Sequence, residues 1–189
     1  MKKIILLIIL TLTFTFFLNI GNVFAEEFNP LDVVKVMEFD VNKDEVVIEE
    51  IVYLDMTLDE LAEKLNRSLS STLTNKGMSF AKSSVKYGVD PYLVLAISLH
   101  ETGCKWTCSR LVRQCNNVGG VKGSPSCNGG SYRSYESLDA WIDAFIRNIK
   151  YNYYDKGLDT AYEMQRKYTG GSTTWAGKVE KYIKEIKSK

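Results

Sequence analysis

Residues 90–103 read DPYLVLAISLHETG, and this segment decides the fold. Asp90 is typical of a helix N-cap and Pro91 of the first helical residue, so a helix is predicted from Pro91 to about Thr102. The residues of Tyr92–Leu99 are apolar almost all round the helix, which indicates burial on every side. We therefore expect a mainly α domain that packs around one central buried helix.

Glu101 lies at the C-terminal end of this helix. The negative end of the helix dipole and partial desolvation both favour the neutral carboxyl group, and so raise its pKa. A glycosidase acid needs such a raised pKa, although an ordinary surface glutamate could also end a helix. Adjacent helical residues point about 100° apart, so His100 is predicted to pack or cap rather than to share a reacting atom with Glu101.

Further amphipathic helices are predicted on both sides of this segment. Thr57 and Glu60 have the spacing of a capping box, Gly88 suits a left-handed helix end, and Ser137 suits an N-cap. The predicted helices cover 57–69, 78–87, 138–149 and 175–186. Residues 116–135 are rich in Gly, Ser and Asn, which predicts a loop with a short hairpin.

The N-terminal residues have the order of a secretory signal peptide. Lys2 and Lys3 precede an apolar run, Ile4–Ile20, which is followed by Val23–Ala25 as a cleavage site. We expect residues 1–25 to be removed, leaving no stable membrane span. The alternative is an uncleaved anchor, because about 17 apolar residues nearly span a bilayer.

Residues 26–56 are predicted to form a separate N-terminal extension. The β-prone runs 33–37 and 46–48 are separated by a polar turn, which favours a short β-hairpin. The helical domain is then predicted to cover residues 57–189, a length suited to one compact domain.

The charge of the chain is nearly balanced. Lys and Arg number 24 and Asp and Glu number 23, giving a net charge of +1. Removal of the signal peptide takes away two lysines and no acidic residue. Because no strong basic field remains, nucleic acid is not expected as a partner.

The four cysteines, Cys104, Cys108, Cys115 and Cys127, fall in one stretch. In an exported chain this even, clustered count predicts two disulfides. A zinc site next to His100 is the alternative, but the spacing does not match paired CxxC ligands, so we expect no metal. The spacing leaves three pairings open; we favour Cys104–Cys108 with Cys115–Cys127, because the second pair would clamp the loop between them.

Five ordered segments carry a resemblance to a known family. They are the lead-in Leu65–Gly77 with Phe80–Ala81 and Lys86–Pro91, then His100–Gly103, Asn116–Gly123, Tyr132–Ser137, and Tyr168–Thr169 with Trp175–Val179. Through them, residues 57–189 resemble the glucosaminidase domain of bacterial autolysins, the mannosyl-glycoprotein endo-β-N-acetylglucosaminidase-like family. The resemblance implies a lysozyme-like helical fold.

The resemblance also implies roles for individual residues. Glu101 would be the general acid, and Tyr168 would face it across the cleft as the second catalytic residue. Asn116, Asn117 and Gly119 would shape the floor beside the glutamate and contact substrate. Amide side chains offer donors and acceptors for N-acetyl and hydroxyl groups, and a glycine lets a sugar approach the backbone.

Tyr132 and Tyr135 have flat ring faces on which sugar rings could lie, so they are further candidates for substrate binding. An anchoring role in the core explains these tyrosines equally well.

The sequence departs from the family's pattern in two places. Cys104–Cys108 lies where family members often have small residues, and Ser124–Ser131 contains no second acidic residue. The nearest carboxylates, Glu136 and Asp139, lie at a predicted helix start, where capping explains them. A scheme with two catalytic carboxylates is therefore in doubt.

The signal peptide predicts secretion, and the resemblance implies a wall-associated monomer that hydrolyses peptidoglycan glycan strands without a cofactor. The expected reaction is cleavage of β-1,4 bonds between N-acetylated sugars, of the endo-β-N-acetylglucosaminidase type. A lytic transglycosylase or muramidase on the same fold is the first alternative, because fold and acid would be shared. A non-catalytic wall-binding module is the second.

Overall fold

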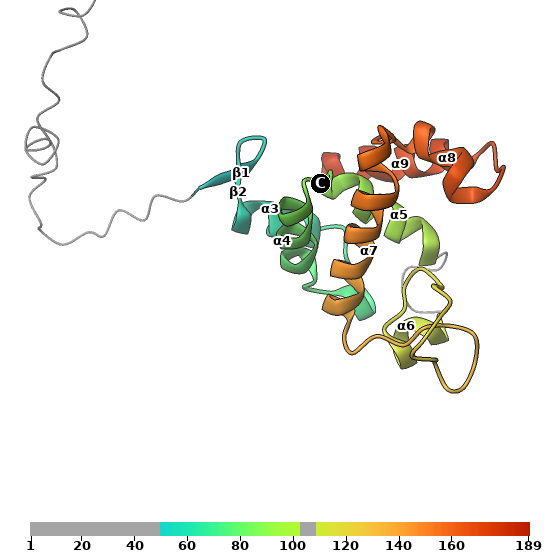
Figure 1. Ribbon diagram of the computed structural model, residues 1–189. Helices are drawn as coiled ribbons and strands as arrows, with labels where there is room; N and C mark the ends of the chain where they lie inside the picture. Colours follow the sequence, from blue (N-terminus) through green and yellow to red (C-terminus); the bar gives the residue numbers. More distant parts are fainter. Residues whose placement is uncertain (1–49, 103–108) are drawn as a thin grey trace, which may run out of the picture. The chain divides into compact units, whose positions relative to one another are not determined.

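The computed structural model describes residues 50–102 and 109–189, whose helices and strands are labelled in Figure 1. Helices dominate this part of the chain, which confirms the predicted mainly α class. The described elements are β1 (Ile51–Tyr53), β2 (Met56–Thr57), α3 (Leu58–Asn66), η1 (Ser71–Leu73), α4 (Gly77–Tyr87), α5 (Pro91–Thr102), α6 (Arg110–Cys115), α7 (Leu138–Asn152), η2 (Tyr154–Lys156), α8 (Ala161–Thr169) and α9 (Trp175–Ser188).

Three of the sequence predictions concern residues outside the described ranges. These are the signal peptide, the hairpin strands 33–37 and 46–48, and the pair Cys104–Cys108. Within the described ranges, no helix has both the length and the apolar character needed to cross a bilayer.

A short antiparallel hairpin, β1–β2, lies at the end of the predicted 26–56 extension. In it Tyr53 pairs with Met56 across the turn. The Tyr53 hydroxyl donates to Oδ1 of Asp90 over 3.2 Å. The last residues of the extension are therefore tied to the helical body at the start of α5.

Helix α5 is buried as its sequence predicts. All side chains of Tyr92–Ser98 are buried. Oδ1 of Asp90 accepts from the backbone N–H groups of Tyr92 (2.8 Å) and Leu93 (3.3 Å), and so satisfies donors that the first helical turn leaves free. The predicted N-cap is therefore confirmed, and the helix begins at a fixed position.

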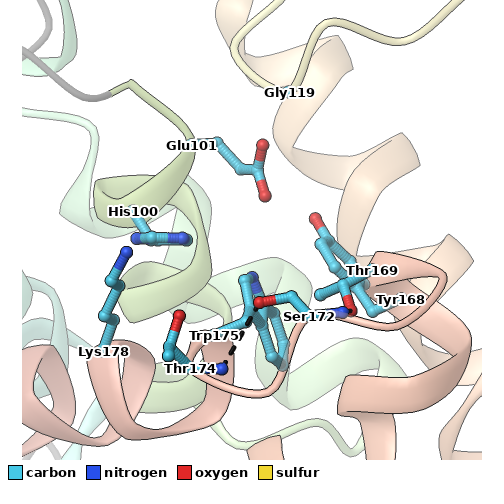
Figure 2. Close-up of a pocket in the computed structure, with 9 residues that line it drawn as sticks. All are labelled: His100, Glu101, Gly119, Tyr168, Thr169, Ser172, Thr174, Trp175 and Lys178. Atoms are coloured by element: carbon cyan, nitrogen blue, oxygen red, sulfur yellow. Dashed lines mark hydrogen bonds between the residues drawn. The ribbon is translucent and has the colours of Figure 1, made fainter.

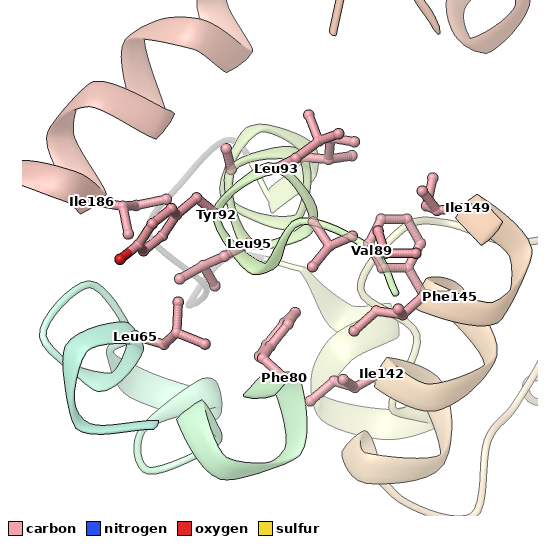
Figure 3. Packing of buried hydrophobic residues seen from close by; sticks show 14 of the residues in the cluster. Leu65, Phe80, Val89, Tyr92, Leu93, Leu95, Ile142, Phe145, Ile149 and Ile186 are labelled. Atoms are coloured by element: carbon pink, nitrogen blue, oxygen red, sulfur yellow. The ribbon is translucent and has the colours of Figure 1, made fainter. Parts of the chain in front are cut away.

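Side chains from four other helices surround α5. Leu65 of α3, Phe80 of α4, Ile142 of α7 and Ile186 of α9 belong to one buried cluster with Leu95 of α5 (Figure 3). Each fully buried side chain of this size contributes roughly 1.5–3 kcal/mol relative to an exposed position. Because α5 is packed on every side, it cannot rotate without opening the core.

The three predicted capping positions, Thr57, Gly88 and Ser137, are also confirmed, whereas the first helix ends at Asn66 and not at residue 69. In the capping box, the Glu60 backbone N–H donates to Thr57 Oγ1 (3.3 Å) and the Thr57 N–H donates to Glu60 Oε2 (2.8 Å). Gly88 ends α4 in the left-handed conformation, with φ of 63°. Ser137 Oγ accepts from the Ala140 N–H over 3.1 Å at the start of α7.

Two helices, α6 and α8, were not predicted. Helix α8 starts with a second capping box, Thr160 and Glu163, so its signal was present in the sequence. Helix α6 spans six residues and has no side-chain cap, so it left no such signal. The predicted loop 116–135 contains an antiparallel bridge between Lys122 and Tyr132, in agreement with a short hairpin.

Gly77 is required by the close approach of α3 and α4. A Cβ atom there would lie 2.1 Å from the backbone oxygen of Ala62. We expect Gly77→Ala to lower the free energy of unfolding by about 1–3 kcal/mol through overpacking. A Cβ at Gly177 would meet no atom within 4 Å, so Gly177→Ala is the matched control and should stabilise by about 0.5–1 kcal/mol. Urea denaturation measures both; a Gly77→Ala protein as stable as wild type would contradict this packing argument.

Candidate active site

A cavity of about 510 Å³ lies where the C-terminal end of α5 faces the end of α8 and the first turn of α9. Its lining comes from segments that are far apart in the sequence (Figure 2). The lining residues are His100, Glu101, Gly119, Tyr168, Thr169, Ser172, Thr174, Trp175 and Lys178.

Glu101 points into this cavity from the last turn of α5 (Figure 2). The side chain keeps contact with solvent, so its desolvation is partial. This partial burial still raises the pKa of Glu101 above its usual value, and the nearby Tyr168 hydroxyl offsets part of the increase. Among the described residues that line the cavity, Glu101 alone carries a carboxylate.

Tyr168 faces Glu101 from the end of α8 (Figure 2). Its ring stacks on Trp175, with centroids 4.7 Å apart and planes at 24°, and tilts against Tyr153 at 5.8 Å. Burial and then the charge of Glu101 raise the pKa of the Tyr168 hydroxyl well above its usual range. The hydroxyl is therefore protonated at every physiological pH and can donate to the carboxylate of Glu101.

The turn between α8 and α9 is held by side-chain hydrogen bonds to the backbone. Thr169 Oγ1 accepts from the N–H groups of Gly171 (3.3 Å) and Ser172 (2.9 Å). Gln165 Oε1 accepts from the Ala176 N–H over 3.0 Å and so connects α8 to the first turn of α9. These contacts fix the cavity wall opposite Glu101.

His100 and Lys178 form another side of the cavity. The His100 ring lies 6.4 Å from the ring of Tyr182, in agreement with a packing role. Burial, and then the charge of Lys178, lower the pKa of His100, so its imidazole is neutral near pH 7. Lys178 is exposed, and its side chain is the positively charged one among the described residues that line the cavity.

Of the predicted floor residues, Gly119 lines the cavity, whereas the two asparagines hold its loop. The buried Asn117 amide donates to the carbonyl oxygens of Val121 (2.8 Å) and Arg133 (2.7 Å), and its Oδ1 accepts from the Val121 N–H (2.9 Å). Asn116 donates to the carbonyl oxygen of Tyr135 over 2.9 Å. Both amides therefore act on the shape of the loop.

Tyr132 and Tyr135 do not line this cavity. The Tyr132 side chain is exposed, whereas Tyr135 is half-buried and has the guanidinium of Arg133 over its ring at 5.3 Å. The predicted Cys115–Cys127 disulfide is confirmed, with Cα atoms 5.7 Å apart.

The two acidic residues assigned to helix capping lie elsewhere. Glu136 is exposed, and Asp139 lies in the first turn of α7. Partial burial tends to raise the pKa of Asp139, but hydrogen bonds from Lys76 and Ser79 hold it below its usual value. Within the described residues, no three His, Cys, Asp or Glu side chains are grouped so that they could hold a metal ion.

Sequence reasoning did not identify the α8–α9 turn and the start of α9 as part of the site. Thr169, Ser172, Thr174, Trp175 and Lys178 all line the cavity. Several of them belong to the closing motif of the resemblance, from which only Tyr168 was expected to face Glu101.

Loss of the Asn117 amide should weaken the loop that carries Gly119. Because Asn117→Ala removes the three hydrogen bonds between the buried amide and the loop backbone, we expect the free energy of unfolding to fall by about 1–3 kcal/mol. The control is Asn148→Ala on the exposed face of α7, which should stay within about 0.5 kcal/mol of wild type. Thermal unfolding measures both, and equal stability of the two variants would argue against this role.

Comparison with known families supports the sequence resemblance. The family described as "Glucosaminidase: Mannosyl-glycoprotein endo-beta-N-acetylglucosaminidase" matches residues 77–188. No curated protein matches the chain.

Solved structures of Staphylococcus aureus autolysin E share the fold. Autolysin E is 20% identical with a TM-score of 0.52, and the match covers 85% of this chain and 78% of that one. Its complex with the muropeptide NAM-L-Ala-D-iGlu is 19% identical with a TM-score of 0.53 and the same coverage. A catalytic glutamate-to-alanine mutant bound to the disaccharide NAG-NAM is 20% identical, with a TM-score of 0.52 and the same coverage. The lysozyme-like fold expected from the sequence is thus confirmed.

Proposed function

The chain belongs to the mannosyl-glycoprotein endo-β-N-acetylglucosaminidase family and is a glycoside hydrolase, and we propose that Glu101 is its general acid. The proposed reaction is cleavage of peptidoglycan glycan strands at β-1,4 bonds between N-acetylated sugars. One observation carries the assignment. Among the described residues that line the cavity, Glu101 is the one with a carboxyl group, and it lies at the end of the buried helix α5.

The environment of Glu101 suits proton donation. A glycosidase acid must hold its proton near neutral pH and deliver it to the leaving oxygen. Partial burial raises the pKa of Glu101 in that direction. After the transfer, the Tyr168 hydroxyl donates to the new carboxylate and stabilises it. Tyr168 thus acts on the reaction through Glu101.

With a single carboxylate in the described cavity lining, the group that reacts with the positively charged anomeric carbon must come from elsewhere. In this proposal, water or the acetamido oxygen of the substrate reacts with that carbon, the latter as in substrate-assisted glycosidases. The same single glutamate suits a lytic transglycosylase or a muramidase, in which it acts first as acid and then as base. That reaction is the second candidate.

The substrate-binding assignments also remain proposals. Gly119 would allow a sugar to approach the backbone at the cavity wall. Asn116 and Asn117 would contribute by holding that wall in shape. Tyr132 and Tyr135, outside the cavity, would contact sugar units farther along the glycan strand.

The autolysin E complexes with a muropeptide and with NAG-NAM support peptidoglycan as the substrate. We further propose that residues 1–25 form a cleaved signal peptide and that residues 57–189 form the catalytic domain behind the 26–56 extension. The mature protein would be a secreted, wall-associated monomer that needs no cofactor.

Glu101→Gln tests the assignment directly. The variant keeps the shape of the side chain but cannot supply a proton, so wall digestion should slow by about 10²–10⁴-fold. Thermal stability near pH 7 should hold or rise, because a raised carboxyl pKa means that the folded state disfavours the charged form above that pKa. Glu136→Gln, at an exposed glutamate, is the matched control and should digest walls normally. A folded Glu101→Gln protein with more than about a tenth of wild-type activity would exclude Glu101 as the principal acid.

The pH dependence of kcat/KM should reflect the two influences on the pKa of Glu101, which are its partial burial and the hydrogen bond from Tyr168. Because the acid must be protonated, kcat/KM falls as pH rises through the pKa of Glu101, which lies above 4.5. Tyr168→Phe removes the donor that lowers this pKa, so the falling limb should move to higher pH. Tyr162→Phe, at an exposed tyrosine of the same helix, should leave the limb unchanged. Movement of the Tyr168→Phe limb to lower pH, or none, would contradict this electrostatic coupling.

A further inference from the structure

The indole N–H of Trp175 is a buried donor without a partner among the described residues. The side chain is only 4% exposed, yet it lines the same cavity as Glu101. Buried indole N–H groups usually find an acceptor, since leaving them unpaired is unfavourable. In Figure 2 the ring lies below Glu101, with its nitrogen directed toward the cavity.

The Trp175 ring is held so that it cannot turn to another acceptor. Its face stacks on Tyr168 at 4.7 Å, and the next backbone N–H, that of Ala176, is bound by Gln165. The donor is therefore fixed in place before any ligand arrives. A preorganised donor of this kind selects for an acceptor at one point in the cavity.

An N-acetylated sugar carries a suitable acceptor in the carbonyl oxygen of its acetamido group. An indole N–H can only donate, so it discriminates strongly between a carbonyl oxygen and a group that has no acceptor. The amine of a de-N-acetylated sugar is such a group when it is protonated. Lys178, an exposed residue that lines the same cavity, would also repel that ammonium.

We propose that the Trp175 N–H hydrogen-bonds the acetamido carbonyl oxygen of the sugar bound beside Glu101, and so makes the enzyme select N-acetylated over de-N-acetylated glycan. The inference rests on the proposed glycosidase function and adds a specificity-determining residue to it.

The test compares one preparation of purified glycan strands in three forms: N-acetylated, chemically de-N-acetylated, and de-N-acetylated then re-acetylated. Wild-type enzyme should cleave the first and third with kcat/KM at least about tenfold above that for the second. Trp175→Phe should lower kcat/KM on the acetylated strands about tenfold, mainly by raising KM. The ratio of kcat/KM on acetylated strands to kcat/KM on de-N-acetylated strands should fall by a similar factor.

A second substitution separates the hydrogen bond from ring packing. Benzothienylalanine at position 175 keeps the bicyclic ring but has no N–H, so it should reproduce the loss of preference. Trp141→Phe is the matched control: the Trp141 indole N–H is also buried and without a partner among the described residues, but it does not line the cavity. This variant should keep the wild-type preference.

The outcomes distinguish this inference from the function on which it rests. If benzothienylalanine at position 175 keeps the wild-type preference while Glu101→Gln is inactive, the role of Trp175 is wrong and the proposed function stands. If Glu101→Gln retains activity, the proposed function is wrong. A preference that narrows equally in the Trp141→Phe control would also overturn the assignment to Trp175.

Discussion

Burial of α5 on all sides fixes where the carboxyl group of Glu101 can lie. The apolar side chains of α3, α4, α7 and α9 close around this helix, and Asp90 fixes its first turn. Glu101 lies in the last turn of α5, at the edge of the core, where its side chain is only partly desolvated. This turn is also the C-terminal end of the helix, where the helix dipole is negative. The packing that stabilises the fold thus also favours the protonated carboxyl group.

The opposite wall depends on how α8 meets α9. Thr169 and Gln165 hold the turn and the start of α9, and Tyr168 and Trp175 stack there, facing the glutamate. One wall carries Glu101, the proposed acid, while the other carries a hydroxyl donor and an indole donor. In the proposed function, the protonation of Glu101 and the recognition of the sugar both depend on this stacked pair, because Tyr168 acts on Glu101 and Trp175 on the sugar.

The sequence predicted features that depend on local chemistry. The apolar segment after an N-cap predicted helix α5 and the position of Glu101 at its end. The predicted disulfide between Cys115 and Cys127, which closes the loop between them, is also present. The indole N–H of Trp175, which has no partner in the described part of the chain, and the backbone contacts of the Asn117 amide were not predicted. Periodicity shows which face of a helix is buried, but not which distant segment meets it. A motif can therefore be found before the partner of its side chains is known.

The central claim is that Glu101 protonates a glycosidic oxygen and that water completes the cleavage. Mass spectrometry of fragments released from purified walls in water labelled with heavy oxygen tests it most directly. The account predicts fragments that end in a reducing N-acetylglucosamine with one labelled oxygen, and almost none from Glu101→Gln. Unlabelled anhydro ends, reducing N-acetylmuramic acid ends, or equal release by Glu101→Gln would contradict it.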